Sequence, residues 1–515
     1  MRHHGSLWPR TAMAAAGVLL AAMLPFSAAG AKTANISSEQ NWPLAGQNLH
    51  NTRYNASERK INASNVANLK VKWSLQTEGD VVATPTVYQG TLYTTDRGGN
   101  LLSVNAASGK VNWSKKVGDY TGLTGDASRT SPLVFGDEII IGTGGGANLV
   151  GVDRFTGAFR WKTPLENNEY ARVTGSPIID NGVVYVGVSS GEETAPPEHK
   201  VVFRGTVQAL DARTGKLLWK SYMVPEGYTG GAVWSSTPVM DHRRGLLYVS
   251  TGNNYTVPDG VCETPDETGC APMADDNYID AVVALKPRTG KVAWAQKTLT
   301  ADVFPLPGRG LDYDFASGPN LYTTVIHGHY KDVLGVGQKS GYYYAFDPDN
   351  KGKPMWQTLV GPGSKFGGIQ WGSATDGRRI YTGITNYDHK PYEITSADGT
   401  KTTITGGSWA ALDAATGKIL WQTADPQGNG DMGFISTANG VVYANSLSPK
   451  GNSMYALDGA TGSVRWGFDS GGSVIGGAAV VDGTVYWGSG YWIPWTNEGE
   501  NNMLYAFSLD GRSGS

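Results

Sequence analysis

The chain contains very few cysteines. Only Cys262 and Cys270 occur among 515 residues, both in the segment VPDGVCETPDETGCAPMADD. No C-x-x-C-H motif is present, which excludes covalent attachment of a c-type haem, and two thiols are too few for a thiolate metal site. In an exported protein this pair predicts one disulfide that closes a surface insertion.

Long hydrophobic runs and a strong charge bias are also missing. The formal net charge is −3 and no basic stripe occurs, so nothing indicates nucleic acid binding. The one apolar run lies within Met1 to Ala31, after Arg2 and Arg10, and is too short to span a membrane comfortably. We therefore expect residues 1–31 to be a secretory signal. Residues 32–515 would then form one exported domain, periplasmic or secreted, without a stable membrane span.

The usual hydrolytic and metal motifs are absent as well. The chain has eight histidines, none in an H-E-x-x-H spacing, and no G-x-S-x-G elbow. The glycine runs GTGGGAN and TGGAVW lie between predicted strands with no helix after them, which is typical of turns and not of phosphate-binding loops.

Glycine and tryptophan, in contrast, are abundant, with 70 and 16 residues. One sequence unit recurs, and its clearest copy is VQALDARTGKLLW, ending at Trp219. An apolar run leads to Asp and Thr-Gly, which predict a turn, and a second short run closes on the tryptophan, as in a β-hairpin. Further copies close at Trp161, Trp294, Trp356, Trp421 and Trp466, with weaker ones at Trp113 and Trp73.

Second strand pairs, such as GSPIIDNGVVYVG, lie between these units. Eight units with four strands each predict an all-β chain, folded as one eight-bladed antiparallel β-propeller. A β-sandwich or a row of small domains would not explain the regularity. We expect each tryptophan to fill the wedge between neighbouring blades. The C-terminal stretch Met503 to Gly511 has the apolar strand without a closing tryptophan, and should pair with the strand of Trp73 to close the ring.

Two features resemble one enzyme family. Trp42 with Asn51-Thr52-Arg53-Tyr54, followed by the repeated A-x-D-x-x-T-G-x-x-x-W, resembles the pyrroloquinoline quinone (PQQ) dependent alcohol dehydrogenases. The repeat also occurs in non-enzymatic propellers, such as an outer-membrane assembly lipoprotein. It therefore predicts the fold, and the activity must be argued from polar residues that the repeat does not require.

The resemblance implies a metal ion and a base. The family's quinone accepts hydride from an alcohol, aided by a divalent ion that acts as a Lewis acid. Glu193 in GVSSGEE and Asn253 in STGNNY resemble the metal ligands, with Glu192 as a rival for Glu193. Asp314 in DYDFASGPN resembles the carboxylate that contacts the ion and takes the substrate proton, and Asp312 is the alternative.

The two registers imply different ions. With Asp314 as the base, the position of the second aspartate found in lanthanide-using relatives is Ala316, which implies Ca²⁺. With Asp312 as the base, Asp314 would fill that position and a lanthanide would be favoured. The spacing to the next strand at Leu321 favours Asp314 and calcium.

A second set of residues resembles the quinone site. Trp234 in GGAVWSS matches the stacking tryptophan, and Lys339 in GQKSG would contact the quinone oxygens and share the catalytic role with Asp314. The other candidates for cofactor binding are Arg129, Thr174, Ser190, Gly191, Asn386 and Trp487. The chain departs from many relatives in two ways: TGLTGDASRT lacks their adjacent cysteine pair, and Val82 replaces a glutamate.

The phrases around Arg129, Asn253 and Asp314 most resemble polyvinyl-alcohol dehydrogenases, which act on secondary alcohols of a polymer. Those usually carry a haem-c domain, which this chain lacks. We therefore predict an exported quinoprotein that oxidises primary or secondary alcohols and passes electrons to a separate acceptor, such as a soluble cytochrome c. A non-catalytic scaffold propeller, and a quinone enzyme that acts on a sugar or aldehyde, are the alternatives.

Overall fold

A computed structural model describes residues 41–196, 198–235, 237–262, 270–271, 273–304, 311–493 and 498–511. The predicted signal segment, residues 1–31, lies outside these ranges. Within them, no helix has the length and apolar character needed to cross a membrane.

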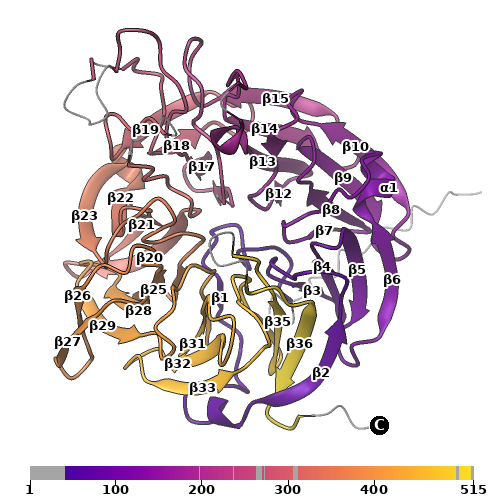
Figure 1. Cartoon of the computed structure of the whole chain (residues 1–515), viewed down its shortest axis with the longest axis vertical. Helices are drawn as coiled ribbons and strands as arrows, with labels where there is room; N and C mark the ends of the chain where they lie inside the picture. Colours follow the sequence, from indigo (N-terminus) through magenta and orange to yellow (C-terminus); the bar gives the residue numbers. More distant parts are fainter. Residues whose placement is uncertain are drawn as a thin grey trace, which may run out of the picture. The chain divides into compact units, whose positions relative to one another are not determined.

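Eight antiparallel sheets follow one another around a ring, as the sequence predicts (Figure 1). The first four consist of β3 (Thr86–Tyr88), β4 (Thr91–Thr95), β5 (Asn100–Asn105) and β6 (Val111–Lys116); β7 (Leu133–Phe135), β8 (Glu138–Gly142), β9 (Asn148–Asp153) and β10 (Phe159–Pro164); β12 (Ile178–Asp180), β13 (Val183–Ser190), β14 (Thr206–Asp211) and β15 (Leu217–Tyr222), extended by β11 (Ala171–Arg172); and β16 (Val239–Asp241), β17 (Leu246–Ser250), β18 (Ala281–Leu285) and β19 (Val292–Lys297).

The remaining four sheets complete the ring. They consist of β20 (Asn320–Ile326), β21 (His329–Gly337), β22 (Tyr342–Asp347) and β23 (Lys353–Leu359); β24 (Ala374–Thr375), β25 (Arg379–Ile384), β28 (Ser408–Asp413) and β29 (Ile419–Ala424); β30 (Ser436–Ala438), β31 (Val441–Asn445), β32 (Met454–Asp458) and β33 (Val464–Phe468), joined by β1 (Tyr54–Asn55); and β34 (Ala479–Val481), β35 (Thr484–Ser489), β36 (Met503–Ser508) and β2 (Lys70–Gln76). Outside the blades lie the hairpin β26 (Tyr392–Thr395) and β27 (Lys401–Ile404), the short helix α1 (Val117–Thr121), and the 3-10 turns η2 (Val66–Asn68), η3 (Glu192–Thr194) and η5 (Pro348–Asn350).

The repeated Asp and Thr-Gly fix the outer hairpin of a blade. In the third blade, Oδ1 of Asp211 accepts hydrogen bonds from the Thr214 backbone N–H at 2.9 Å and from the Thr214 hydroxyl at 2.7 Å. Gly215 then adopts a φ of 69°, which a residue with a side chain would rarely take. The aspartate therefore locks the turn and the glycine lets the chain reverse, which sets the register of β14 on β15.

The tryptophan that closes one blade packs against the Thr-Gly turn of the next blade. A Cβ atom added at Gly417 would lie 2.4 Å from Cε3 of Trp356, so no side chain fits there. The indole nitrogen often reaches a carbonyl of the next blade, as from Trp421 to Gly459 at 3.1 Å. These contacts confirm that the tryptophans fill the wedges between blades. The same packing joins Trp73, Trp113, Trp161, Trp219, Trp294 and Trp421 to Gly109, Gly157, Gly215, Gly290, Gly352 and Gly462.

The last blade is built from both ends of the propeller. β36 pairs antiparallel with β2, in register from Lys70 opposite Ser508 to Gln76 opposite Met503, and the two strands lie side by side in Figure 1. The ring closure predicted from the C-terminal strand is therefore confirmed.

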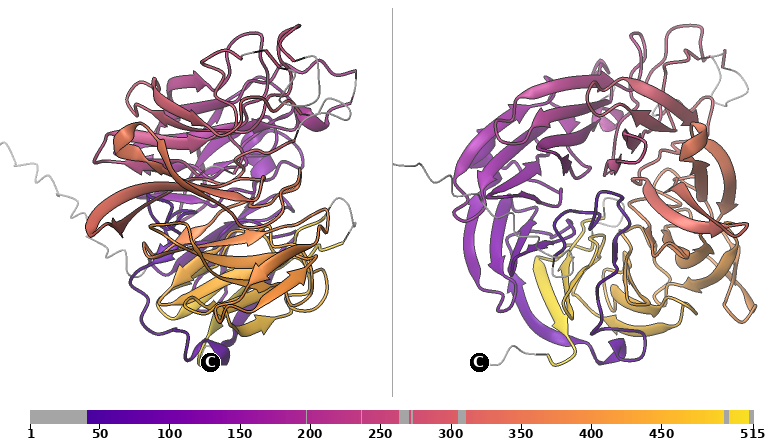
Figure 2. Two further views of the ribbon diagram at one scale, coloured as in Figure 1. Left: turned by 90° about the vertical axis from the view of Figure 1, so that its left-hand side faces the viewer. Right: turned by 180° about the vertical axis from the view of Figure 1, so that it is seen from behind.

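A segment before the first blade, residues 41–55, crosses the middle of the ring (Figure 2, right). The side chain of Asn51 donates to the carbonyl of Pro319 at 2.9 Å, and Nε of Arg53 donates to the carbonyl of Ile435 at 3.0 Å. The segment thus ties distant blades together across the axis. Its further hydrogen-bond partners include Val87, Val134, Met240, Leu321, Thr375 and Val480.

Candidate active site

The predicted site residues gather at one rim of the propeller. The first two strands of each blade form a hairpin, so the loops before the first strand and after the second meet at the rim opposite the hairpin turn. Glu193 lies in η3 just after β13, Asn253 just after β17, and Lys339 just after β21. Three neighbouring blades therefore bring these side chains to the same end of the molecule.

Lys339 joins the two aspartates that the sequence left as rival bases. Its Nζ lies 2.7 Å from Oδ1 of Asp312 and 2.6 Å from Oδ2 of Asp314. The other oxygen of Asp314 accepts a hydrogen bond from the Asn253 backbone N–H at 2.8 Å. Asp314 is fully buried and held by two donors from different blades, so its carboxylate is fixed in one orientation.

Glu192 and Glu193 have opposite surroundings. The carboxylate of Glu192 accepts hydrogen bonds from the backbone N–H groups of Val202 at 3.0 Å and Phe203 at 2.7 Å, and from Nδ2 of Asn168 at 2.8 Å. These bonds hold its own loop together and leave little capacity for a ligand. In contrast, Oε2 of Glu193 is buried and has no hydrogen-bond partner among the described residues. The geometry therefore favours Glu193 over its neighbour as a ligand.

Three of the predicted site residues each have a buried polar atom without a hydrogen-bond partner in the described part of the chain. These atoms are Oε2 of Glu193, Oδ1 of Asn253 and Nε1 of Trp234. The amide nitrogen of Asn253 is already used, because it donates to the carbonyls of Asn254 at 2.9 Å and Phe304 at 3.1 Å. Buried polar atoms are normally hydrogen-bonded. The two oxygens would suit a cation, and the indole N–H would suit an acceptor oxygen. Together the three atoms fit a metal ion with a bound carbonyl compound.

Gly252 makes room for this cluster. A Cβ atom there would lie 2.1 Å from Oδ1 of Asp314 and 3.1 Å from Nε1 of Trp234. The indole edge and the carboxylate thus approach one another over a backbone that carries no side chain. The structure therefore brings the predicted stacking tryptophan and the predicted base to the same place.

The charges of the cluster are strongly coupled. Burial opposes the charge on Lys339, but the carboxylates of Asp312, Asp314 and Glu193 outweigh that effect and raise its pKa. Burial raises the pKa of Glu193 to about 8, against the attraction of Lys339. Burial likewise raises the pKa of Asp312 well above its usual range. One ammonium faces three carboxyl groups, and a bound divalent cation would favour the charged forms of those carboxyl groups.

The predicted metal ligands at the cluster are of two kinds, carboxylate and amide oxygens. In the described ranges no group of three His, Cys, Asp or Glu residues has a metal-binding arrangement. The predicted set consists instead of two carboxylates, Glu193 and Asp314, and the amide oxygen of Asn253. Such an all-oxygen set suits a hard cation such as Ca²⁺.

The loop that carries both aspartates is held by a residue that the sequence analysis missed. Asp302 accepts hydrogen bonds from the backbone N–H groups of Leu311 at 3.1 Å, Asp312 at 3.2 Å and Tyr313 at 2.7 Å. Burial raises its pKa to about 6. No pattern in the sequence marks Asp302, because its partners are backbone groups nine to eleven residues away.

Several predicted cofactor residues support the walls of the site. The hydroxyl of Thr174 donates to the carbonyl of Trp234 at 2.6 Å and lies 2.8 Å from the hydroxyl of Ser189. The hydroxyl of Ser190 accepts from the Glu192 backbone N–H at 3.0 Å, which shapes the turn into η3. Gly191 continues this turn. Thr174 and Ser190 therefore position Trp234 and the glutamate loop within the protein itself.

Arg129 stacks on a second tryptophan that was not predicted. Its guanidinium carbon lies 4.2 Å from the ring centre of Trp371, and burial lowers its pKa. Trp371 occurs in GGIQWGSA, outside the closing T-G-x-x-x-W units, as Trp234 does. The same signal that singled out Trp234 could therefore have identified Trp371.

Asn386 and Trp487 have no hydrogen bond to this cluster among the described residues. The Asn386 amide is used in its own loop, where it donates to the carbonyls of Lys390, Thr405 and Gly406. Trp487 is fully buried, and its indole N–H donates to the carbonyl of Gly476 at 2.6 Å. Both lie in later blades, and their role in cofactor binding stays a prediction.

The two cysteines form the predicted disulfide. Cys262 and Cys270 belong to the long connection between β17 and β18, which carries Asn253 and Asn254 near its start. The disulfide is confirmed, whereas its predicted influence on the substrate entrance stays a prediction.

Comparison with known proteins agrees with this architecture. Residues 42–361 match the PQQ family model, described as glucose/ethanol/alcohol dehydrogenase, β-propeller domain. Later repeats, in residues 339–491 and 405–513, match the model of the outer membrane protein assembly factor BamB.

Individual relatives point the same way. The chain is 31% identical to a polyvinylalcohol dehydrogenase of Sphingopyxis sp., over 88% of this chain and 74% of the relative. It is 30% identical to a polyvinylalcohol dehydrogenase of Pseudomonas sp., over 93% of this chain and 78% of the relative. The crystal structure of quinohemoprotein alcohol dehydrogenase from Comamonas testosteroni superposes with a TM-score of 0.70 at 20% identity, covering 93% of this chain and 82% of the other.

Proposed function

The chain belongs to the family of PQQ-dependent alcohol dehydrogenases, and from this premise we propose that Glu193, Asn253, Asp314 and Lys339 form its catalytic centre. When bound, the quinone supplies the electrophilic carbon that takes up the hydride of an alcohol. The residues of the chain supply the metal ligands, the base and the surrounding walls.

Glu193 and Asn253 hold the divalent ion. Their side-chain oxygens are buried without a protein partner, which is the observation that carries the proposal. Asp314, in the connection between β19 and β20, adds a carboxylate to this set of ligands. Calcium is the ion we propose, because Ala316, two residues after the base, offers no further carboxylate for a lanthanide.

Asp314 takes the proton from the substrate hydroxyl. Lys339 and the Asn253 backbone N–H hold its carboxylate in position, and a positioned carboxylate is an effective general base. Lys339 remains charged because three carboxyl groups surround it. It therefore provides a fixed positive charge that can stabilise negative charge developing on a nearby oxygen.

Trp234 forms one wall of the quinone site, and Arg129, Thr174, Ser190 and Gly191 line its edge. A planar acceptor suits the indole face, and the guanidinium of Arg129 suits a carboxylate of the cofactor. Asn386 and Trp487 are proposed as later-blade contacts.

The substrate is a primary or secondary alcohol, and a polymer or another bulky alcohol is the favoured class because two relatives are polyvinylalcohol dehydrogenases. The absence of a haem-attachment motif from the sequence supports transfer of electrons to a separate protein, such as a soluble cytochrome c. An exported location, with residues 1–31 removed, fits the apolar N-terminal run.

The test is a reconstitution of the full chain with PQQ and calcium, followed by reduction of a dye acceptor. Primary alcohols, secondary alcohols, vinyl alcohol oligomers, aldehydes and sugars are supplied in turn. Reduction with alcohols that disappears in Asp314→Asn is the expected result. Reduction with aldehydes or sugars alone would refute the alcohol assignment, and no reduction with any substrate would favour a scaffold role.

A further inference from the structure

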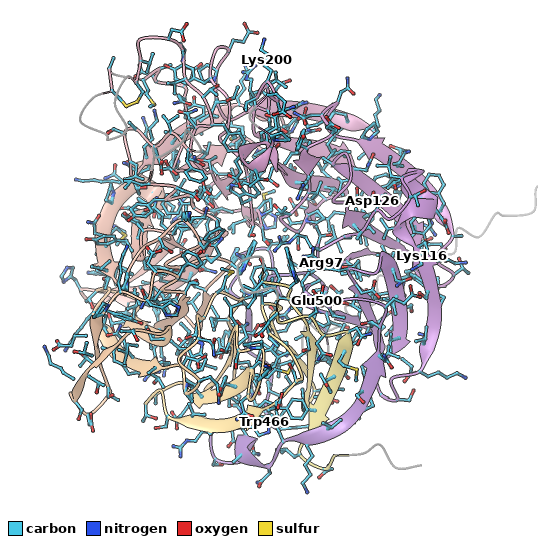
Figure 3. The ribbon with its side chains drawn as sticks, viewed as in Figure 1. Arg97, Lys116, Asp126, Lys200, Trp466 and Glu500 are labelled. Atoms are coloured by element: carbon cyan, nitrogen blue, oxygen red, sulfur yellow. A yellow bond between two sulfur atoms is a disulfide. The ribbon has the colours of Figure 1, made fainter. Side chains whose placement is uncertain are left out.

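A cleft of about 470 Å³ opens beside the proposed quinone site. It is lined by the loop from Leu123 to Arg129, by Gly144 and Gly145, and by Arg172 to Thr174, with Arg97 at its margin. Arg129 and Thr174 are already part of the proposed cofactor site. In Figure 3, Arg97 and Asp126 lie toward the interior of the ring, on neighbouring blades. Such a volume suits a small ligand.

Three guanidinium groups, those of Arg97, Arg129 and Arg172, border this one cleft. In the part of the chain that the structure describes, none of them forms an ion pair with a carboxylate. Several other arginines do, as Arg160 does with Asp153 at 2.7 Å. Unpaired arginines that share a cleft indicate an anionic ligand with several charged groups.

Two acidic residues, Asp126 and Glu169, also line the cleft. Oδ1 of Asp126 accepts a hydrogen bond from the Gly145 backbone N–H at 2.7 Å, which ties two of the lining loops together. Asp126 therefore has a structural role. The lining still carries more guanidinium than carboxylate groups, so it favours an anion over a cation.

The position of Arg172 is the most specific of the three. It lies on β11, a short strand that extends the sheet of the third blade, and pairs with Ser189 on β13. A Cβ atom at Gly191 would lie 2.9 Å from Nη2 of Arg172. The guanidinium therefore crosses directly over Gly191, between the open cleft and the loop that carries Glu193.

We propose that Arg172, assisted by Arg97 at the margin, joins Arg129 in binding the carboxylates of the quinone. The inference rests on the proposed function and deepens it. The quinone carries three carboxylates, and the cleft offers three arginines that form no ion pair within the described ranges. Arg172 provides the central contact because it is fixed by strand pairing, whereas Arg97 lies beside Asp80 at the edge of a second cleft.

The test measures quinone binding and not turnover. The full chain is produced without quinone, loaded with calcium and titrated with PQQ, and binding is followed by quenching of tryptophan fluorescence. Arg172→Gln is expected to raise the Kd about ten- to a hundredfold, the loss typical of a charge-assisted hydrogen bond. Arg172→Lys should fall between this variant and the wild type, and Arg97→Gln should have a smaller effect than Arg172→Gln.

Arg378→Gln is the matched control. Arg378 is an exposed arginine in the turn between β24 and β25, and its backbone N–H and carbonyl are hydrogen-bonded, to Asp376 and Ala414. This variant should bind PQQ as the wild type does. Because Arg172 is exposed to solvent, its replacement should leave the thermal unfolding curve unchanged.

The trimethyl ester of the quinone separates carboxylate binding from other effects. Wild type and Arg172→Gln should bind this neutral ester equally, and both should retain equal calcium. An Arg172→Gln variant that binds PQQ as tightly as wild type, or that loses the same factor for acid and ester, would overturn the inference. If the wild-type chain with calcium does not bind PQQ at all, the proposed function itself has failed.

Discussion

The joints between blades, where a closing tryptophan packs on the turn of the next blade, can be compared with the polar cluster at the rim. Both contain tryptophan and polar side chains, but they differ in how many of their buried polar atoms are hydrogen-bonded. At the joints, buried tryptophan N–H groups mostly donate to carbonyls of the next blade, as Trp421 does to Gly459. At the cluster, buried atoms of Glu193, Asn253 and Trp234 have no hydrogen-bond partner among the described residues. Most of the repeated tryptophans thus complete their hydrogen bonding on folding, whereas these non-repeated residues keep polar atoms available to a ligand.

The largest effect is expected for Asp314→Asn. An amide cannot accept the substrate proton at neutral pH, so turnover should fall by roughly 10²–10⁴-fold, the usual contribution of general acid–base catalysis. Quinone should stay bound in excess calcium, because the side chain keeps its shape and Lys339 still has Asp312, although the loss of one carboxylate ligand should weaken calcium binding. Steady-state kinetics with a dye acceptor and cofactor content by absorbance give the two readouts.

Asp312→Asn is the control for this experiment. Asp312 also contacts Lys339 but has no bond to Asn253 in the structure, so its replacement should reduce turnover only mildly when calcium is present. If Asp312→Asn abolishes turnover and Asp314→Asn removes only lanthanide-supported activity, the base is Asp312 and the ion is a lanthanide.

A substitution at a joint between blades should reduce stability and not catalysis. Trp421→Ala removes a fully buried indole that packs on Gly462, and should lower the free energy of unfolding by about 3–5 kcal/mol. Chemical denaturation measures this loss. The turnover per folded molecule and the Kd for quinone should stay near wild type, and a selective loss of either would contradict the separation of the two regions.

The neighbours Glu192 and Glu193 allow the same comparison within a single turn. Glu193→Gln should weaken calcium retention by at least about tenfold, the order of loss seen when groups that support a metal are removed, and excess calcium should partly restore quinone binding. Glu192→Gln should instead destabilise its loop, because Glu192 accepts bonds from Val202 and Phe203. Equilibrium dialysis with calcium distinguishes them, and equal retention by the two variants would show that Glu193 is not a ligand.

One joint has an unusual titratable group. Near Trp161, whose indole N–H lacks a partner, burial raises the pKa of Glu138 to about 7 from its ordinary 4.5. The folded state thus holds this proton more tightly, so its stabilisation is complete below pH 4.5 and is lost as the pH rises through 7. Glu138→Gln should remove that loss and be more stable than wild type at pH 8, by up to about 3 kcal/mol.

Denaturant titrations of wild type and Glu138→Gln at pH 4 and pH 8 check this prediction. The two proteins should differ little at the lower pH, where the wild-type carboxyl is protonated in both the folded and the unfolded state. A constant difference between them at both pH values would mean that Glu138 acts through packing and not through its proton.

The smallest effect is expected for the disulfide. Replacing Cys262 and Cys270 together by serine opens a loop with a sequence separation of eight residues, and should cost less than about 2 kcal/mol of global stability because the closed loop is short. Proteolysis of that connection should accelerate while the melting temperature changes little. In the native wild type neither thiol should react with an alkylating reagent, and modification of either would show that the bond is absent in solution.

The fold was predictable because the same sequence unit occurs in every blade. Asp, Thr-Gly and Trp recur with the same roles, so an error in one copy is corrected by the others. The site was predictable only as far as its residues resemble a family, as Glu193, Asn253 and Lys339 do. Asp302 and Arg172 were missed because each acts through one backbone loop or one added strand, which leaves no periodic signal in the sequence.

The segment of residues 41–55 has a consequence for the order of events in turnover. It is hydrogen-bonded to the first strands of the blades, near the hairpin turns, and so occupies the axis at the rim opposite Asp314 and Lys339. On the proposed function, the alcohol, the oxidised product and the electron acceptor must then all reach the site from the same rim, the one that carries Asp314 and Lys339. The product must leave before the acceptor can approach, so the reaction should follow an alternating, ping-pong sequence.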